Sequence, residues 1–208
     1  MNTEFVVNAK ELKKMERVKR LKLINSISGI KSANLIGTKS KNGISNLCII
    51  SSVTHIGSNP PLIGFISRPN NKVKRDTFNN ISENPYFTIN SVEHSKVQNA
   101  HMTSAKYDKK ISEFDKCGFK EIYIKDFPIP FVSSSRLKIG LKLMQKLKLI
   151  NGTYFIIGQI EILNMPLHDV DKIMKKNIGV VGLNTYYSIK KIKEFDYVRL
   201  NEKSSNGH

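Results

Sequence analysis

The sequence predicts a mainly β protein, an antiparallel barrel with peripheral helices. Short apolar runs rich in β-branched residues recur along the chain, separated by turns of Gly, Pro, Asn and Ser. Few long helical patterns lie between these runs, which argues against a doubly wound parallel sheet. Residues 136–149 support the barrel most directly, because their apolar Leu and Ile side chains fall on odd positions. A period of two is typical of a half-buried strand or hairpin.

The chain begins with a basic amphipathic pattern over residues 10–24, in which Leu12, Met15, Val18 and Leu21 recur at a spacing of three. Such a helix either contacts a membrane or packs on its own domain, and we expect packing. The expected organisation is a helical extension over residues 1–25 that packs on the barrel, a barrel domain over 26–200 and a disordered tail over 201–208.

After this helix, strands are expected to alternate with turns and short helices. The expected strands cover residues 32–38, 46–54, 62–67, 86–92, 122–124, 136–149 and 154–163. The expected turns are 40–43 and 57–61, and the expected helices are 75–84 and 93–104. Asp76 or Thr77 can cap the first of these helices, and Gly158 is a candidate β-bulge. Residues 170–176 and the region after 182 show no clear period.

The chain is strongly basic, with 34 Lys and Arg against 17 Asp and Glu and a net charge of +17. One interpretation is a nucleic-acid-binding β-barrel, because clustered Lys and Arg side chains bind the phosphates of a nucleic acid. The other is a lysine-rich solvated surface, which the scattered lysines and the absence of a known nucleic-acid motif favour. A positive surface would also attract phosphorylated cofactors and nicotinamide nucleotides.

Several kinds of site are excluded by the motifs that the sequence lacks. It contains no GxGxxG after a strand, no P-loop, no HExxH and no GxSxG, and its histidines lack metal-ligand spacing. Cys48 and Cys117 are far apart and suggest two reduced thiols in a cytoplasmic protein. Neither a signal-peptide pattern nor an apolar run of membrane-spanning length is present. Glu113 and Asp115 do not make a convincing acid–base pair. We therefore assign no catalytic side chain and no metal ligand, and expect a cofactor to carry any chemistry.

Polar residues gather at the ends of two apolar runs and at the start of the helix that follows. Ser51, Ser52, Val53 and Thr54 offer hydroxyls and backbone N–H groups that suit the edge of a planar heterocycle. Ser67, Arg68, Arg75 and Thr77 offer bonds to a phosphate, two of them at a helix start. A planar ring with a phosphate tail would satisfy both groups. An ordinary hairpin followed by a capped helix explains the same residues, and both interpretations remain open at this level.

Longer motifs carry a family resemblance. From Asn46 the chain reads N-L-x-x-x-S-S-V-x-H-x-G-x-N-P-P-L-x-G-F-I-x-R-P, and from Arg75 it reads R-D-T-x-x-N-I-x-E-x-x-x-x-x-I-N. Further motifs are AHMTSAKY from Ala100, ISEF from Ile111 and GLNTYY from Gly182. Together they resemble the flavin reductase-like, FMN-binding split-barrel family over residues 24–187, nearly the whole chain.

The resemblance implies a Greek-key split β-barrel that forms a homodimer, with one FMN per subunit near the dimer interface. In this family Asn46 and residues 51–54 would line the flavin ring. The phosphate would be held by Ser67, Arg68, Arg75 and Thr77. His101 and Tyr186 would approach the ring or close the pocket. The implied activity is that of a flavin reductase: NADH or NADPH reduces the flavin, which passes electrons to a partner oxygenase or another acceptor. A flavin-binding protein without turnover is the alternative within the family.

Overall fold

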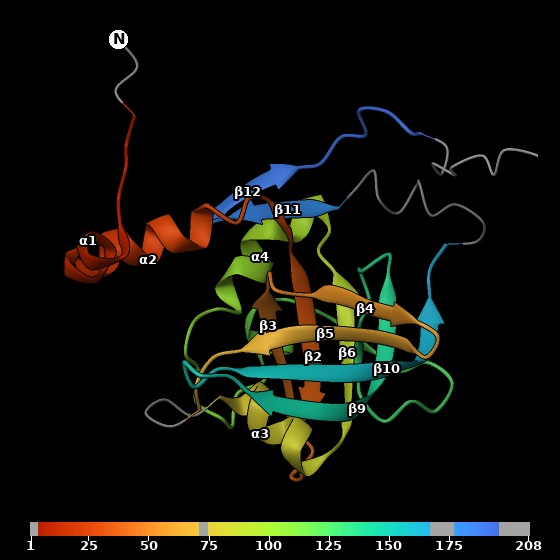
Figure 1. Cartoon of the computed structure of the whole chain (residues 1–208). Coiled ribbons are helices and arrows are strands. Elements are labelled where there is room, and N and C mark those ends of the chain that lie inside the picture. Colours follow the sequence, from red (N-terminus) through yellow and green to blue (C-terminus); the bar gives the residue numbers. More distant parts are fainter. Residues whose placement is uncertain (1–3, 71–74, 167–176, 196–208) are drawn as a thin grey trace, which may run out of the picture.

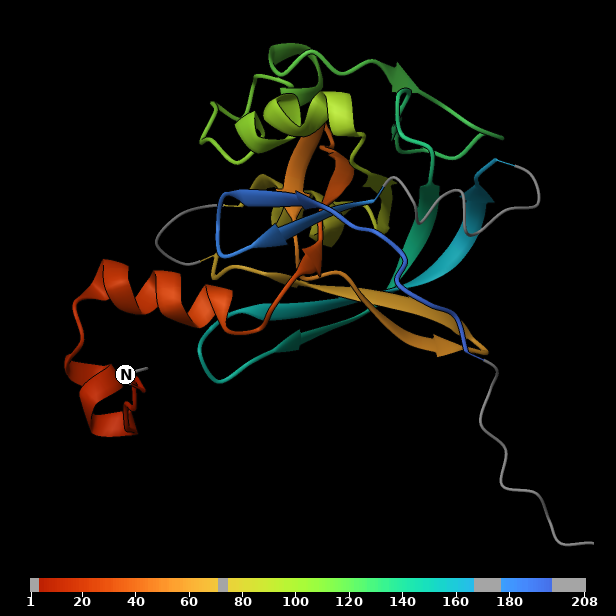
Figure 2. The same ribbon diagram turned by 90° about the horizontal axis from the view of Figure 1, so that it is seen from above.

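A seven-stranded antiparallel sheet forms the centre of the computed structural model, which describes residues 4–70, 75–166 and 177–195. The strand order is β3-β2-β6-β9-β10-β5-β4. The bounds are β2 Asn34–Lys39, β3 Ser45–Ile50, β4 Thr54–Ser58, β5 Pro61–Ser67, β6 Tyr86–Ser91, β9 Lys138–Lys148 and β10 Tyr154–Asn164. The sheet curls, so that β4, β5, β10 and β9 cross the direction of β3, β2 and β6 (Figure 1). Seen from above, the two groups of strands lie in separate layers (Figure 2). The prediction of a mainly β, antiparallel protein is confirmed.

The main core lies between these layers. Phe65 on β5, Phe87 on β6 and Ile156 on β10 are 0% exposed, and the Phe65 and Phe87 rings meet edge to face with centroids 5.7 Å apart. The alternation over residues 136–149 produces the single long strand β9, as expected for a strand with one face in the core. Gly158 lies at a bulge, also as predicted. A Cβ at this position would lie 2.6 Å from the Phe87 ring, so the core leaves no room for a side chain.

A second core lies on the other face of β2 and β3, beneath short helices and a small sheet. It joins Leu47 of β3 to Phe114 and Val180. The covering elements are α4 Val97–Met102 after the 3-10 helix His94–Lys96, α5 Glu113–Lys116, β1 Lys31–Ser32, β11 Ile178–Val181 and β12 Thr185–Ser188. The remaining elements are α3 Asp76–Glu83, β7 Glu121–Ile122 and β8 Phe131–Val132. The tail at 201–208 and residues 170–176 lie outside the described residues.

One expected strand is two strands in the structure. The prediction of a single strand over residues 46–54 is wrong, because β3 ends at Ile50 and β4 begins at Thr54. The two strands also lie at opposite ends of the sheet, where β4 pairs with β5 and β3 pairs with β2. The physical reason is Ser52, whose Oγ accepts from Ile66 N at 3.0 Å and lies 3.3 Å from Ile66 O. This hydroxyl bonds the backbone of β5 at Ile66, beyond the part of β5 that pairs with β4, and it holds the segment between β3 and β4 against β5.

The N-terminal segment forms two helices, α1 Ala9–Lys14 and α2 Arg17–Ser26, where the pattern predicts one. The carboxylate of Glu16 accepts from Val18 N and Lys19 N at 2.7 and 2.8 Å, which starts a new helix there. Both helices project from the sheets (Figures 1 and 2), and none of their residues is buried within the single chain. The packing of residues 1–25 on a barrel therefore stays a prediction. None of the described helices has the length and apolar character to cross a membrane.

Candidate functional site

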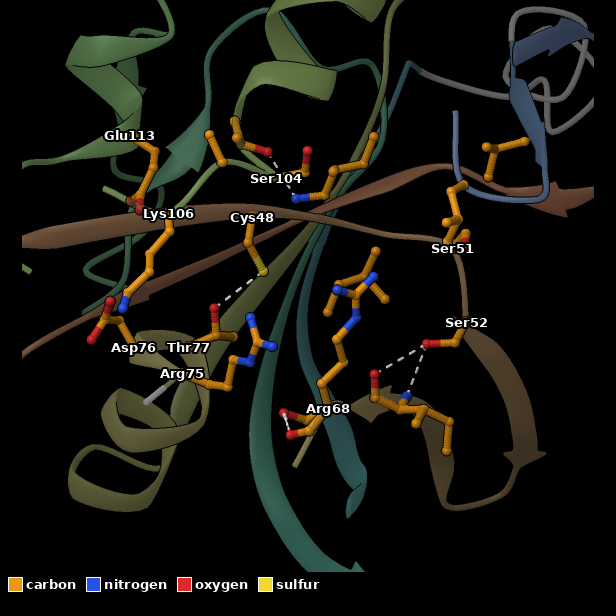
Figure 3. Close-up of a pocket in the computed structure, with 18 of the residues that line it drawn as sticks. Cys48, Ser51, Ser52, Arg68, Arg75, Asp76, Thr77, Ser104, Lys106 and Glu113 are labelled. Atoms are coloured by element: carbon orange, nitrogen blue, oxygen red, sulfur yellow. Dashed lines mark hydrogen bonds between the residues drawn. The ribbon is translucent and has the colours of Figure 1, made fainter. Parts of the chain in front are cut away.

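A cavity of about 400 Å³ opens between the edge of β3, the end of β5, the start of α3 and the strand β12 (Figure 3). Eight of the eleven predicted site residues line it. They are Asn46, Ser51, Ser52, Ser67, Arg68, Arg75, Thr77 and Tyr186. The curling of the sheet brings them together, because β3 and β5 lie far apart in the strand order but converge where Ser52 contacts Ile66.

The cationic end of the cavity is formed by Arg68 and Arg75, whose guanidinium groups extend into the same space (Figure 3). Arg75 is the N-cap residue of α3, and its backbone N–H donates to Asn70 Oδ1 at 2.5 Å. No side chain of the described residues caps this helix, so the prediction that Asp76 or Thr77 does so is wrong. Arg75 Nε is buried and has no hydrogen-bond partner among the described residues. A helix start and an unpartnered buried guanidinium N–H together favour an anion.

Thr77 bonds to β3 in place of capping its helix. Its Oγ1 lies 2.9 Å from Asn46 Oδ1 and 3.1 Å from Cys48 Sγ. Asn46 Nδ2 donates in turn to Glu113 Oε2 at 2.8 Å. These contacts tie the start of α3, the strand β3 and the helix α5 into one buried polar network below the cavity.

Three further residues line the cavity that the sequence did not identify as site residues: Cys48, Lys106 and Glu113. Burial raises the pKa of the Cys48 thiol to about 11 and raises the pKa of the Glu113 carboxyl group. Lys106 reaches toward Asp76 at the cavity edge (Figure 3). Lys106 lies in the motif AHMTSAKY and Glu113 in the motif ISEF, so these two family motifs could have indicated both residues.

Three predicted site residues do not line the cavity. Val53 packs against the main core, and Thr54 is exposed with its hydroxyl directed to His55 O at 3.3 Å. His101 lies behind Tyr186 and reaches the cavity only through it, since His101 Nδ1 is 2.9 Å from the Tyr186 hydroxyl. Burial raises the pKa of Tyr186, so this phenol stays protonated across the neutral range. No group of three or more potential metal-ligating side chains occurs in the part of the chain that the structure describes.

Comparison with known proteins identifies the fold as a split β-barrel of the flavin reductase type, which confirms the architecture that the motifs implied. Residues 30–177 match the flavin reductase like domain, and the chain belongs to this family.

Three solved structures illustrate the range of similar proteins. A split-barrel protein of Shewanella frigidimarina NCIMB 400, assigned as a flavin reductase, is 41% identical with a TM-score of 0.87, over 94% of this chain and 100% of that protein. Component B of nitrilotriacetate monooxygenase from Bacillus cereus is 18% identical with a TM-score of 0.82, over 94% and 100% of the two chains. An NADH:FAD oxidoreductase of Streptomyces globisporus C-1027 is 11% identical with a TM-score of 0.69, over 91% and 99%. The last two similarities concern the fold alone.

Proposed function

We propose that the chain binds FMN in this cavity and acts as a flavin reductase-like oxidoreductase that uses NADH or NADPH. The observation that carries the proposal is the pair formed by Arg68, which follows β5, and Arg75, the N-cap residue of α3, with Arg75 Nε buried and without a partner among the described residues. One phosphate would satisfy that N–H, and two guanidinium groups suit one phosphate. Family membership supports the flavin as the source of the phosphate.

The rest of the cavity suits the flavin ring. Ser51 and Ser52 supply polar groups along one side, while Cys48, Ile49 and Ile50 form a mostly apolar wall. Such a combination of a flat apolar surface with a few polar groups is typical of sites for planar cofactors. When bound, FMN would supply the redox chemistry by accepting a hydride from the nicotinamide nucleotide and delivering electrons to an acceptor. The residues of the chain would bind and orient the ring and exclude water from it.

A second copy of the chain is the expected partner, and the outer face of β4, β5, β10 and β9 is the surface we propose for it. Ile56 and Phe155 both cover Gly64 on this face, since a Cβ there would lie 2.9 Å from Ile56 Cδ1 and 2.5 Å from the Phe155 ring. Leu147 pairs with Phe155 across the strands and is 39% exposed, while Ile56 is 40% exposed. A contiguous exposed apolar surface of this kind is typical of an interface.

The final electron acceptor is proposed by class only: a partner oxygenase or another electron-accepting molecule. The fold shared with a monooxygenase component supports the first of these. The two free cysteines support the cytoplasm as the compartment, where thiols stay reduced.

Flavin titration of the purified protein tests the proposal. We expect saturable binding of one FMN per chain with quenching of flavin fluorescence, tighter than binding of riboflavin and FAD. Under anaerobic conditions NADH or NADPH should then bleach the flavin absorbance. A protein that binds none of the three flavins would contradict the proposal. Tight FMN binding without reduction by either nucleotide would instead identify a flavin-binding protein without turnover.

A further inference from the structure

A buried carboxyl group lies in the wall of the cavity without a cationic partner in the described part of the chain. Glu113, the first residue of α5, is 7% exposed. Its Oε2 accepts from Asn46 Nδ2 at 2.8 Å and from Leu47 N at 3.1 Å, two neutral donors. Within the described residues it makes no ion pair. Burying a carboxylate against neutral donors is costly, so the group is expected to have a specific role.

Part of this role is to bond the free edge of β3, beside which no further strand lies in the segments that the structure describes. Leu47 N donates to Glu113, and Ile49 N donates to Thr103 Oγ1 at 2.9 Å. Backbone N–H groups alternate in direction along a strand, so these two point to the same side. Ser51, the next residue in this alternation, lines the cavity. The side chains of Glu113 and Thr103 thus bond the edge of β3 as a strand would. The backbone N–H of Ser51 is left available to a ligand.

The other part of the role concerns the amide of Asn46. Its Oδ1 lies 2.9 Å from Thr77 Oγ1 and 3.3 Å from Thr38 Oγ1, and a threonine hydroxyl can donate to an oxygen or accept from an N–H. The threonines therefore do not decide which end of the amide faces them. An ionised carboxylate only accepts, so Glu113 requires Nδ2 on its side. The second Nδ2 hydrogen has no acceptor among the described residues, and Asn46 lines the cavity.

We propose that Glu113 is a positioning residue, whose carboxylate orients Asn46 so that an N–H rather than a carbonyl oxygen is offered to the ligand. The ligand edge that Asn46 meets is accordingly a hydrogen-bond acceptor, such as the ring carbonyls and imine nitrogens of a flavin. This inference rests on the proposed function and adds to it a residue that acts through Asn46. A protonated carboxyl group could donate to a reversed amide, so the orientation depends on the ionised form.

The charge state of Glu113 is influenced by groups on several elements. Burial raises its pKa and the nearby carboxylate of Asp76 on α3 adds to this, while the bonds from Leu47 and Asn46 act in the opposite direction. Among the other titratable or charged groups, Cys48 and Cys117 each feel its charge, as does the phenol of Tyr107. Arg75 and Lys106 also line the cavity. As the pH falls through the raised pKa of Glu113, we therefore expect Asn46 no longer to be held with its N–H toward the ligand.

Flavin titrations of Glu113→Ala, Glu113→Gln and Glu113→Asp in the full chain test this inference. Glu113→Ala should weaken FMN binding about threefold to tenfold, the range for a lost hydrogen bond, and Glu113→Asp should recover part of that loss. The loss should vanish when Asn46→Ala is already present. Asp115→Asn changes the same charge at an exposed position of the same helix and should leave the affinity unchanged. Circular dichroism confirms that each variant is folded.

The pH profile separates positioning from structural support. The wild-type affinity for riboflavin, which has no titrating phosphate, should fall toward acid pH, and that dependence should be absent in the isosteric Glu113→Gln. An identical pH dependence in the wild type and in Glu113→Gln would overturn the inference. It would also be overturned if Glu113→Ala weakened FMN binding as much in the Asn46→Ala variant as in the wild type. Unchanged binding by Asn46→Ala would overturn it as well. If the wild type binds no flavin at all, the proposed function itself fails, and the two failures are thereby distinguished.

Discussion

His101 and Tyr186 are 85 positions apart in the sequence, yet the His101 Nδ1 and the Tyr186 hydroxyl oxygen lie 2.9 Å apart. Their rings meet edge to face, with centroids 5.7 Å apart and an interplanar angle of 85°. This contact joins α4 to β12 beside the cavity that Tyr186 lines. His101 therefore supports the cavity wall from behind.

The pair predicts equal effects from two different substitutions. Tyr186→Phe and His101→Phe each remove the hydrogen bond and keep an aromatic ring at both positions, so each should weaken FMN binding only about twofold to fourfold. Tyr186→Ala also removes the ring and should weaken it more. Fluorescence titration measures all three. A larger loss from His101→Phe than from Tyr186→Phe would mean that His101 touches the ligand directly.

The cationic end of the cavity predicts a loss that depends on the phosphate. Arg68→Ala or Arg75→Ala should weaken FMN binding by about 1.5–3 kcal/mol, the cost of a lost charged hydrogen bond. Riboflavin lacks the phosphate and should lose much less in the same titration. Arg17→Ala removes an exposed cation from α2 and controls for the change in net charge. Equal losses for FMN and riboflavin would show that the two arginines are structural.

The thiol of Cys48 should react slowly with alkylating reagents. Its pKa of about 11 reflects burial in the apolar wall, which disfavours the thiolate. Because the folded-state pKa is raised, the thiolate forms only as the pH rises toward that value. At pH 8 the rate should be about two orders of magnitude below that of a free cysteine.

Peptide mapping by mass spectrometry separates Cys48, which is half-buried, from the buried Cys117. The rate at Cys48 should rise about tenfold per pH unit between pH 7 and 10, and bound FMN should lower it further. A rate that levels off near pH 9 would contradict the raised pKa.

Gly37 on β2 predicts a large effect on stability from a single methyl group. A Cβ there would lie 2.4 Å from Thr88 Oγ1 and 2.9 Å from Pro130 O, and the second atom is backbone. Gly37→Ala should therefore lower the free energy of unfolding by about 1–3 kcal/mol, as overpacking does. In Gly57→Ala the new methyl would lie 3.5 Å from Pro60 O, an ordinary contact, so this variant is the control in denaturant unfolding. Similar losses in both would show that close packing at Gly37 is not the cause, since the lower backbone entropy of the unfolded chain should stabilise both variants.

The outer sheet face predicts that single charges dissociate a homodimer. Ile56→Lys or Leu147→Lys would place a cation in the proposed interface, and light scattering after size exclusion should shift from dimer to monomer. Leu163→Lys alters a residue that is 50% exposed near the end of β10 and should leave the mass unchanged. A wild-type monomer, or a dimer that survives both substitutions, would place any partner elsewhere.

Much of the fold could be predicted because local patterns follow from periodicity. Alternation over residues 136–149 predicted β9, and the run before Ser67 predicted β5, since side-chain direction repeats every two residues in a strand. The prediction failed at residues 51–53, where the composition still resembles a strand. The Ser52 hydroxyl bonds Ile66 across the curled sheet, and no local pattern shows that contact.

The candidate site was predicted in part for the same reason. Arg68, Arg75 and Thr77 stand out because polar groups at a strand end or a helix start have recognised uses. Glu113 did not stand out, because a glutamate at the start of a short helix is ordinary until its burial is known. Its partner Asn46 lies 67 positions away, and their contact depends on how α5 packs on β3.

The sequence by itself determined the mainly β class, most strand positions and the family, because these depend on residue periodicity and on long local motifs. Only the tertiary structure decided that β3 and β5 converge through Ser52, that Asn46 donates to Glu113 and that His101 contacts Tyr186. The physical reason is that these contacts require the sheet to curl and the helices α4 and α5 to pack on β3, over the second core. That arrangement is set by the joint burial of residues far apart in the chain, which no single segment encodes.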